Sequence, residues 1–438
     1  MANPFLPLWE YIPDGEPRVF GDRVYIYGSH DRPSCEFFCD YRLKVWSAPV
    51  DDLENWQCHG VSFRTRKGDE PGDVPWTDGE LYAPDVVEKD GKFYLYSYIV
   101  GSKGAAAVSD RPEGPFTLLG QYICDDADAG DDGVFNDPGV LVDDDGSVYI
   151  YYGFERSHFG QIDPGDMRTV IKGSYMADLI PPGSEQEDFF EASSPRKIGG
   201  RYYLIYSPRK GSQLSYAISD SPKGPFKRMG PIIDNGEDYP GGNDHGSLCC
   251  IGGQWYIFYH RMTNGSIMSR RACVERVQIL PDGTIPKVEM TSLGFSKSLD
   301  PYKETPAEIA CVLRGGCLIT EKDVLTREVT SIKTGAVIGY RYFDFGEDFS
   351  GSPVALCLKT TGRGMISDVH VILDDPGSGQ EVGVCRVEAG DGIFRAKLPS
   401  ITGRHAVFFR AEHIYKDWWS HCFNDRELFG LVSFVFLK

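Results

Sequence analysis

Three acidic residues stand in short motifs that could support acid–base chemistry. Asp14 lies in Pro-Asp-Gly-Glu-Pro, Asp137 in Asn-Asp-Pro-Gly and Glu191 in Phe-Glu-Ala-Ser-Ser. Glycoside hydrolysis needs one protonated carboxyl group for the leaving oxygen and one ionised carboxylate. Glu191 follows Phe189 and Phe190, so burial should raise its pKa, and repulsion from Asp137 should raise it further. Asp14, in a polar stretch rich in Gly and Pro, should stay ionised and act as a base toward water.

Other residues could complete such a site. Tyr82 and Trp76 could form a wall on which the C–H face of a sugar stacks, and Arg270 or Arg271 could bind a sugar hydroxyl. His245, in Asp-His-Gly-Ser, is a further candidate. Each also has a plain structural interpretation. The two aspartates could be turn residues, the histidine a core residue, the aromatic residues packing residues, and the arginines members of surface ion pairs.

A repeat indicates how these residues are positioned. A glycine followed by an aromatic strand occurs five times, and the segment Ala107–Phe116 returns with small changes as Ala217–Phe226. A period near 50 residues, made of short strands and turns, is typical of a β-propeller blade. Five copies predict five blades, and the alternative is a β-sandwich with unrelated aromatic hairpins. The repeated glycines are Gly21, Gly91, Gly146, Gly200 and Gly253.

The candidate residues share a register within this repeat. Asp14, Tyr82, Asp137, Glu191 and His245 precede the glycine of their own copy by 7 to 9 residues. Such similar offsets predict equivalent places on the innermost strands, at one mouth of the central channel. Blades one and four are not adjacent in a ring of five, so the first and fourth carboxylates should face each other across the mouth. We expect a separation of about 6.5–9.5 Å, which suits an inverting mechanism.

The strand pattern changes after the fifth copy. A polar, Pro-containing stretch from about Lys287 to Thr305 predicts a linker, and a β-sandwich follows it. The expected fold is therefore all-β, with a five-bladed β-propeller in residues 1–300 and a β-sandwich in residues 306–438. The strands expected in the second unit are 334–345, 369–373, 404–409 and 428–437.

Composition and charge argue against several classes of protein. The chain has 438 residues and a net charge of -19, which argues against a nucleic-acid surface. It has no apolar run of about 18 residues that could cross a membrane. The first residues do not resemble a signal peptide, so we expect a cytoplasmic location. The 12 Cys have no CxxC spacing, which predicts reduced thiols and no zinc site. The sequence leaves the oligomeric state open, and a homo-oligomer is one of the alternatives.

Residues 3–300 resemble glycoside hydrolase family 43. The resemblance rests on Pro-Asp14, Tyr82-Ala-Pro-Asp, Asn-Asp137-Pro-Gly, Phe-Glu191-Ala-Ser-Ser-Pro and His245-Gly-Ser. It implies inverting enzymes on a five-bladed β-propeller, with the first aspartate as general base, the glutamate as general acid and the second aspartate tuning that acid. The histidine would lie beside a water-coordinated calcium ion, and no organic cofactor is implied. Arg270 resembles the arginine of the family's Arg-Gln-Ala-Phe segment.

Two departures from the family pattern leave alternatives open. The first blade reads Ile-Pro-Asp-Gly-Glu-Pro where many members have Ala-Asp-Pro, so Glu16 is a second candidate base. Tyr82 replaces a tryptophan, which leaves the sugar open. We expect an exo-acting α-L-arabinofuranosidase or β-D-xylosidase that trims short plant-polysaccharide oligosaccharides. Alternatives are an endo-arabinanase, an exo-galactanase or galactofuranosidase, and a non-catalytic sugar-binding propeller.

The C-terminal unit resembles a family 6-type carbohydrate-binding module. The segments that carry this resemblance are 336–346, 403–409 and 429–434. Trp418 and Trp419 could form a sugar platform there, or they could pack against the propeller.

Overall fold

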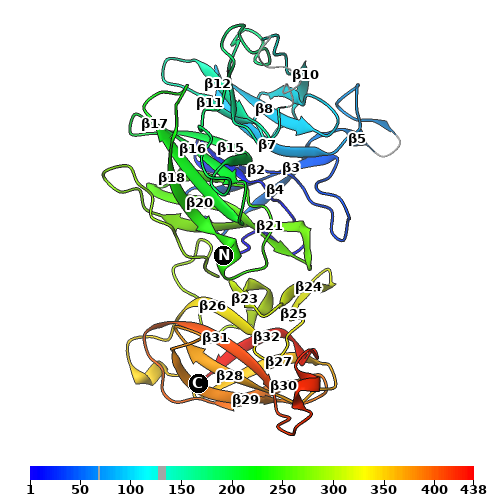
Figure 1. Ribbon diagram of the computed structural model, residues 1–438, viewed down its shortest axis with the longest axis vertical. Helices are drawn as coiled ribbons and strands as arrows, with labels where there is room; N and C mark the ends of the chain where they lie inside the picture. Colours follow the sequence, from blue (N-terminus) through cyan, green and yellow to red (C-terminus); the bar gives the residue numbers. More distant parts are fainter. Residues whose placement is uncertain (68–69, 127–134) are drawn as a thin grey trace.

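The computed structural model describes residues 1–67, 70–126 and 135–438, and most of its ordered elements are β-strands. Two bodies lie one above the other along the long axis, with the N-terminus at their junction (Figure 1). Five blade sheets from residues 16–277 form one body, and two sheets from residues 305–437 form the other. The predicted all-β fold, a five-bladed β-propeller followed by a β-sandwich, is confirmed. In the described residues, no helix is long and apolar enough to cross a membrane.

Each of the first four blades is a four-stranded antiparallel sheet, and the fifth has three strands. The blade strands are, in chain order, β1 (Glu16–Phe20), β2 (Arg23–Tyr27), β3 (Arg42–Pro49) and β4 (Gln57–Arg64); β7 (Leu81–Lys89), β8 (Lys92–Ile99), β9 (Ala105–Ser109) and β10 (Thr117–Gln121); β11 (Gly139–Val142), β12 (Val148–Tyr152), β13 (His158–Ile162) and β14 (Met176–Ala177); β15 (Phe189–Ile198), β16 (Arg201–Pro208), β17 (Gln213–Ser219) and β18 (Lys227–Asp234); β19 (Ser247–Ile251), β20 (Gln254–Thr263) and β21 (Ser266–Val277). A small ladder of β5 (Arg66–Lys67) and β6 (Glu70–Pro71) and the 3-10 turn η2 (Asn235–Glu237) lie between them.

The repeated glycine forms the turn between the first and second strands of each blade. Gly91 and Gly253 have φ angles of 76° and 81°, a left-handed conformation that glycine adopts without a steric penalty. The strand after each glycine packs its side chains into the cores between neighbouring blades. Burial on both faces explains why these strands read as nearly continuous aromatic and aliphatic runs.

The ring closes through the N-terminal residues. The innermost strands β1, β7, β11 and β15 pack side by side in chain order, and β19 packs against β1. The backbone N–H of Phe5 donates to the carbonyl of Ala272 at 3.1 Å, and the side chain of Asn3 accepts from the N–H of Val274 at 2.9 Å. The N-terminal segment therefore lies beside β21, on the open edge of the three-stranded fifth blade.

Two ion pairs cross the interior of the channel. Arg196 of β15 donates to Glu16 of β1 at 2.7 Å, and Arg18 of β1 donates to Asp85 of β7 at 2.6 Å. Both acids are buried, and the two positive charges balance the two negative ones. Arg196 also donates to the carbonyl of Leu248 at 2.7 Å. These pairs tie blades one, two, four and five together below the channel mouth.

Arg196→Met should destabilise the propeller strongly. It would leave the carboxylate of Glu16 buried without its partner, a change that costs about 3–5 kcal/mol in folding free energy. Urea unfolding followed by tryptophan fluorescence measures this loss. Arg386→Met, which removes an exposed ion pair with Asp368, should change the unfolding curve little. Equal unfolding curves for the two variants would contradict the importance of the channel pairs.

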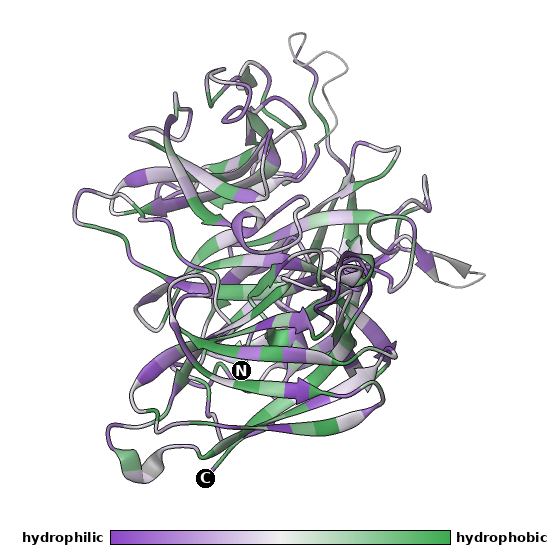
Figure 2. Cartoon of the chain, turned by 60° about the horizontal axis from the view of Figure 1, so that its bottom comes forward, coloured by the Kyte–Doolittle hydropathy of each residue, from purple (hydrophilic) through white to green (hydrophobic). Residues whose placement is uncertain are grey.

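The C-terminal body is a sandwich of a six-stranded and a five-stranded sheet. The first has the order β24-β25-β32-β27-β30 with β22 beside β32, and the second has the order β23-β26-β31-β28-β29. Hydrophobic and hydrophilic residues alternate along the strands at the front of Figure 2, as expected for sheets with one buried face. The elements are β22 (Thr305–Pro306), η3 (Ala307–Ile309), β23 (Val312–Arg314), β24 (Leu318–Asp323), β25 (Thr326–Thr330), β26 (Val337–Asp344), η4 (Phe349–Gly351), β27 (Ala355–Gly362), β28 (Ser367–Leu373), β29 (Gln380–Val387), β30 (Gly392–Lys397), β31 (Arg404–His413), η5 (Ser420–Phe423) and β32 (Phe429–Leu437).

The predicted linker packs into the hydrophobic cores of the protein. Residues 287–304 contain no strand, but Met290 is buried in a core that continues from blades four and five into the sandwich. Phe295 is buried between blades one and five. A continuous core of this kind favours a fixed arrangement of the two bodies.

Candidate active site

The structure brings four of the predicted site residues together at one mouth of the channel. Asp14 and Asp137 lie just before the innermost strands of blades one and three, and Glu191 lies at the start of β15 in blade four. His245, before β19, places its Nδ1 atom 3.8 Å from Asp14 Oδ1 and 3.7 Å from Asp137 Oδ2. Glu191 is close enough to both aspartates for their charges to affect its titration or theirs.

The backbone at this mouth is strained in four blades. Asp14, Ala83, Asp137 and Ala192 have φ angles of 57°, 37°, 46° and 68°. A left-handed conformation costs an L-residue other than glycine about 1–2 kcal/mol. The four positions correspond in the repeat, since each lies where an innermost strand begins. Strain that recurs at equivalent positions beside three carboxylates is typical of a functional site.

Asp14 is held in its ionised form. Its Oδ2 accepts a hydrogen bond from the Ser29 hydroxyl at 2.6 Å, and its Oδ1 accepts from Arg270 at 2.8 Å. Burial opposes ionisation, but the positive charge of Arg270, together with the hydrogen bond from Ser29, holds the Asp14 pKa below its ordinary value. Asp14 can therefore accept a proton at neutral pH.

Arg270 does not form the surface ion pair that was one interpretation of the sequence, because its side chain is buried. Sugar binding by Arg270 stays a prediction. The Arg270 guanidinium donates to both carboxylate oxygens of Asp31 at 2.9 Å and lies over the ring of Phe38, 4.8 Å from the ring centre. Together with the bond to Asp14, these contacts make Arg270 a fixed positive charge behind the carboxylate. Arg271, the next residue on β21, is also buried and interacts electrostatically with Glu308 of the sandwich.

Glu191 is held in its protonated form near neutral pH. Burial, and then the negative charge of Asp14, raise the pKa of Glu191 to about 7, although Arg270 and a hydrogen bond with the Asn243 side chain oppose the shift. Burial was expected from Phe189 and Phe190. The irregular pairing of β15 with β16 around Glu191 places it at the mouth end of the strand.

Asp137 shares this raised affinity for protons. Burial raises the pKa of Asp137 well above its ordinary value, and repulsion from Glu191 and Asp14 raises it further. The sequence analysis expected Asp137 to raise the pKa of Glu191; in the structure the charge that raises the Glu191 pKa is that of Asp14, and Glu191 raises the pKa of Asp137. Because Asp14 stays ionised beside them, Asp137 and Glu191 titrate as a coupled pair that retains a proton at higher pH than an isolated carboxyl group.

Two neutral histidines lie beside Asp14. Burial lowers the pKa of His245, and burial followed by the charge of Arg270 lowers that of His260 to about 3. His260 Nδ1 lies 3.6 Å from Asp14 Oδ1, and its ring nitrogen Nε2 lies 3.1 Å from the carbonyl oxygen of Asn243. Neutral imidazoles can accept or donate hydrogen bonds here without adding positive charge next to the acid.

The sequence interpretation missed Ser29, Asp31 and His260. Ser29 and Asp31 lie just after β2, and His260 follows the aromatic run of β20. A hairpin that starts at the mouth returns to the mouth, so residues at the end of each second strand belong to the site as much as those before the first. The polar triplet Ser29-His30-Asp31 was the signal that could have revealed this.

The remaining predicted residues are less tightly placed. The Tyr82 hydroxyl donates to the carbonyl of Phe38 at 3.3 Å, beside Arg270, so Tyr82 belongs to the rim of the site. Trp76 donates to the Ser102 hydroxyl at 2.9 Å, and the residue is 37% exposed. Within the described residues, no hydrogen bond or ring contact joins Trp76 to the carboxylates. Glu16 pairs with Arg196 inside the channel, which makes Asp14 the better placed of the two candidate bases.

The described part of the chain does not itself build a calcium cage. Calcium takes 6–8 oxygen ligands, most of them from carboxylates and carbonyls when a protein supplies the site. In residues 1–67, 70–126 and 135–438, no group of three or more His, Cys, Asp or Glu side chains is arranged to hold a metal ion. His245 is the metal candidate from the sequence, and beside it an ion would depend on water for most of its ligands.

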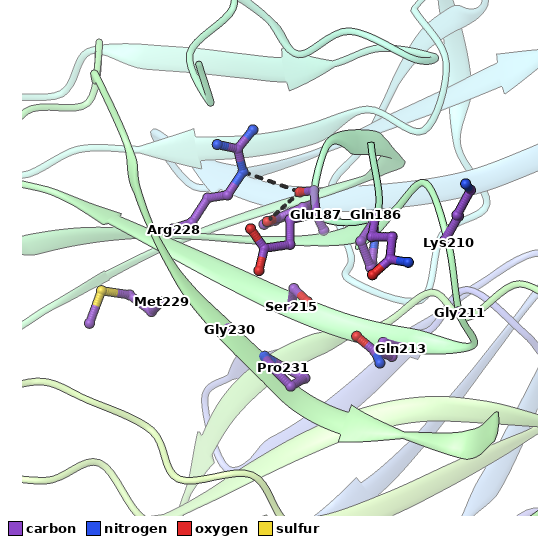
Figure 3. Close-up of a pocket in the computed structure, with 12 residues that line it drawn as sticks. Gln186, Glu187, Lys210, Gly211, Gln213, Ser215, Arg228, Met229, Gly230 and Pro231 are labelled. Carbon is purple, nitrogen blue, oxygen red and sulfur yellow. Dashed lines mark hydrogen bonds between the residues drawn. The ribbon is translucent and has the colours of Figure 1, made fainter. Parts of the chain in front are cut away.

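Two other features lie apart from the carboxylates. Trp418 and Trp419 are 84% and 46% exposed, so the alternative that they pack against the propeller is wrong, and sugar stacking there stays a prediction. A pocket of about 580 Å³ lies on the strands of blade four, where Arg228 donates to the Glu187 carbonyl at 3.1 Å (Figure 3). Its lining includes none of the three carboxylates, so it is separate from the candidate site.

Comparisons with known proteins agree with this geometry. Residues 2–285 match the family model described as glycosyl hydrolases family 43. A xylosidase/arabinosidase of Thermoclostridium stercorarium is 37% identical over 93% of this chain and 95% of its own length. An arabinoxylan arabinofuranohydrolase of Bacillus subtilis, solved with cellotetraose, covers 100% of this chain and 97% of its own, with a TM-score of 0.56 and 24% identity. A β-xylosidase/α-arabinofuranosidase from a compost metagenome, solved calcium-free with xylotriose, covers 66% of this chain and 98% of its own, with a TM-score of 0.56 and 28% identity.

Proposed function

The chain belongs to glycosyl hydrolase family 43 and is a glycoside hydrolase, and on this premise we propose that it releases terminal pentose residues from short oligosaccharides with inversion. The sugars are α-L-arabinofuranosyl or β-D-xylosyl units of plant polysaccharides. One observation carries the proposal. At a single channel mouth, Asp14 is kept ionised while Glu191 is kept protonated. These are the two states that hydrolysis of a glycosidic bond requires.

In this mechanism the two groups act on opposite sides of the sugar. Glu191 donates its proton to the glycosidic oxygen as the bond to the anomeric carbon breaks. Asp14 accepts a proton from a water molecule whose oxygen forms the new bond to that carbon, so the configuration inverts. Arg270 keeps Asp14 ionised and in place until the proton arrives. Asp137, whose own pKa is raised by burial and by the charges of Glu191 and Asp14, tunes and orients the acid, and Tyr82 forms part of the sugar-binding wall.

The pH dependence follows from these titrations. Glu191 must be protonated, so kcat/KM should fall as pH rises through about 7. Asp14 must be ionised, so the acidic limb should lie below the ordinary pKa of an aspartic acid. A bell-shaped profile of kcat/KM, which reports the free enzyme, is the expected measurement. An alkaline limb near pH 4–5 would mean that Glu191 is not the acid.

A panel of p-nitrophenyl glycosides tests the function itself. We expect turnover of the α-L-arabinofuranoside or the β-D-xyloside, and NMR of the first-formed sugar should show the inverted anomer. Activity on linear arabinan alone would indicate an endo-arabinanase instead. Turnover of galactose-based substrates only would indicate an exo-galactanase or galactofuranosidase, and no turnover would indicate a sugar-binding propeller.

Chelation tests the calcium expectation. Since the described residues build no carboxylate cage and Arg270 already supplies the positive charge beside Asp14, kcat should change little after treatment with EDTA. Activity before and after chelation, with calcium added back, measures this. A large loss that calcium reverses would show that an ion held mainly by water and His245 is required.

We also propose that the enzyme works in a reducing compartment, on oligosaccharides that have already entered the cell. All twelve cysteines are free thiols, including seven that are buried, such as Cys273 and Cys311. Proteins of oxidising compartments commonly use such residues in disulfides.

A further inference from the structure

A buried arginine of the sandwich reaches the start of the propeller chain. Arg327 of β25 donates through Nη2 to the carbonyl oxygen of Leu8 at 2.9 Å and to the Tyr11 hydroxyl at 3.1 Å. The same nitrogen donates to Glu321 at 2.8 Å, and Nη1 donates to the carbonyl of Asp323 at 2.8 Å. The guanidinium has no solvent exposure, so these bonds form away from competing water.

The residues that Arg327 holds lead directly to Asp14. Tyr11, Ile12 and Pro13 are all buried, and the proline ring restricts the backbone between the tyrosine and the aspartate. On the other side of the segment, Glu10 accepts hydrogen bonds from Lys44 at 2.6 Å and from the Trp46 indole at 2.6 Å. The strand-like approach to Asp14 is therefore clamped between the propeller and the sandwich.

A chain of hydrogen bonds also connects Tyr11 to Asp14 across the fold. The carbonyl of Tyr11 accepts the backbone N–H of Asp31 at 2.9 Å. Asp31 forms the paired hydrogen bonds with Arg270, and Arg270 donates to Asp14. A shift of Tyr11 would thus move both the chain that carries the carboxylate and the charge that keeps it ionised. Catalytic rates can fall about 100-fold for a displacement near 1 Å.

We propose that Arg327 is a positioning residue for the general base, so that the sandwich is part of the catalytic unit. Through Leu8 and Tyr11 it fixes the left-handed turn at Asp14 and the approach of Arg270. The proposal rests on Asp14 being the base. It assigns the C-terminal body a role in turnover that does not depend on binding carbohydrate there.

The test compares two variants of the full-length protein with a matched control. Arg327→Met removes the charge at similar length, and Tyr11→Phe removes only the accepting hydroxyl. Arg363→Met is the control, since its partners Glu328 and Glu427 both lie in the sandwich. Thermal unfolding confirms that each variant is folded. If Arg327→Met fails to fold, Tyr11→Phe carries the test alone.

We expect Arg327→Met to lower kcat by about 10-fold to 100-fold with KM nearly unchanged, and Tyr11→Phe to lower it less. The acidic limb of the kcat/KM profile should move to higher pH, because Asp14 loses part of its contact with Arg270. Arg327→Lys should recover part of the rate, and Arg363→Met should match the parent. Unchanged kcat and acidic limb in both folded test variants would overturn the proposal. Full activity of Asp14→Asn would remove the base on which the proposal rests, whereas no turnover of any pentoside by the parent protein would overturn the proposed function.

Discussion

Asp14→Asn should lower kcat by about 10²–10⁴-fold, the range expected when a general base is lost. An amide has nearly the shape of a carboxylate but cannot accept the proton that water must lose. The fold should persist because Arg270 keeps both of its bonds to Asp31. Steady-state kinetics on the preferred p-nitrophenyl pentoside measure the loss. Asp22→Asn, in the exposed turn of the same blade, is the matched control and should retain full activity.

Two further experiments distinguish the loss of a general base at Asp14 from a general disturbance of the site: azide rescue of Asp14→Asn and the variant Glu16→Gln. Azide attacks carbon without needing a base, so it should restore turnover of an activated substrate in Asp14→Asn and yield a glycosyl azide. Glu16→Gln should keep kcat per folded molecule close to the parent, although it weakens the pair with Arg196. Activity retained in Asp14→Asn and lost in Glu16→Gln would transfer the base to Glu16.

The sequence predicted the parts of the site that repeat. The offset between each candidate and its glycine is nearly constant, and the hairpin geometry turns that offset into a place at the channel mouth. Asp14, Asp137, Glu191 and His245 could be grouped for this reason without coordinates. The loss of solvation at Glu191, which raises its pKa, was also foreseeable from the two phenylalanines that precede it in the chain.

Contacts between distant segments were not predictable in the same way. The direction of Arg270 depends on Asp31 and Asp14, which lie 239 and 256 residues away in the chain. An arginine in a polar motif is compatible with solvent, substrate or a buried carboxylate, and the sequence does not distinguish them. The contact of Arg327 with Tyr11 spans 316 residues and exists only because the sandwich docks on the propeller.

The strained backbone at the channel mouth could not be predicted from the sequence, for a physical reason. Left-handed backbone is expected at glycine, asparagine or aspartate, and Asp14 and Asp137 fit that rule. Ala83 and Ala192 do not, because nothing in an alanine side chain favours that conformation. There the surrounding packing imposes the turn, and local sequence carries no sign of it.

Glu191→Gln should separate substrates by their leaving groups. The alcohol that departs from an oligosaccharide or an alkyl pentoside is a poor leaving group and needs the proton of Glu191, so kcat on these substrates should fall by about 10²–10⁴-fold. The dinitrophenolate that departs from a dinitrophenyl pentoside is a stable anion and needs little protonation, so kcat on that substrate should fall far less. The alkaline limb near pH 7 should also disappear, because the proton donor that titrates there is gone. Glu187→Gln, four residues upstream and exposed, is the matched control and should behave as the parent. Equal losses for good and poor leaving groups would mean that Glu191 positions the sugar and does not donate the proton, since only a proton donor makes the rate depend on what departs.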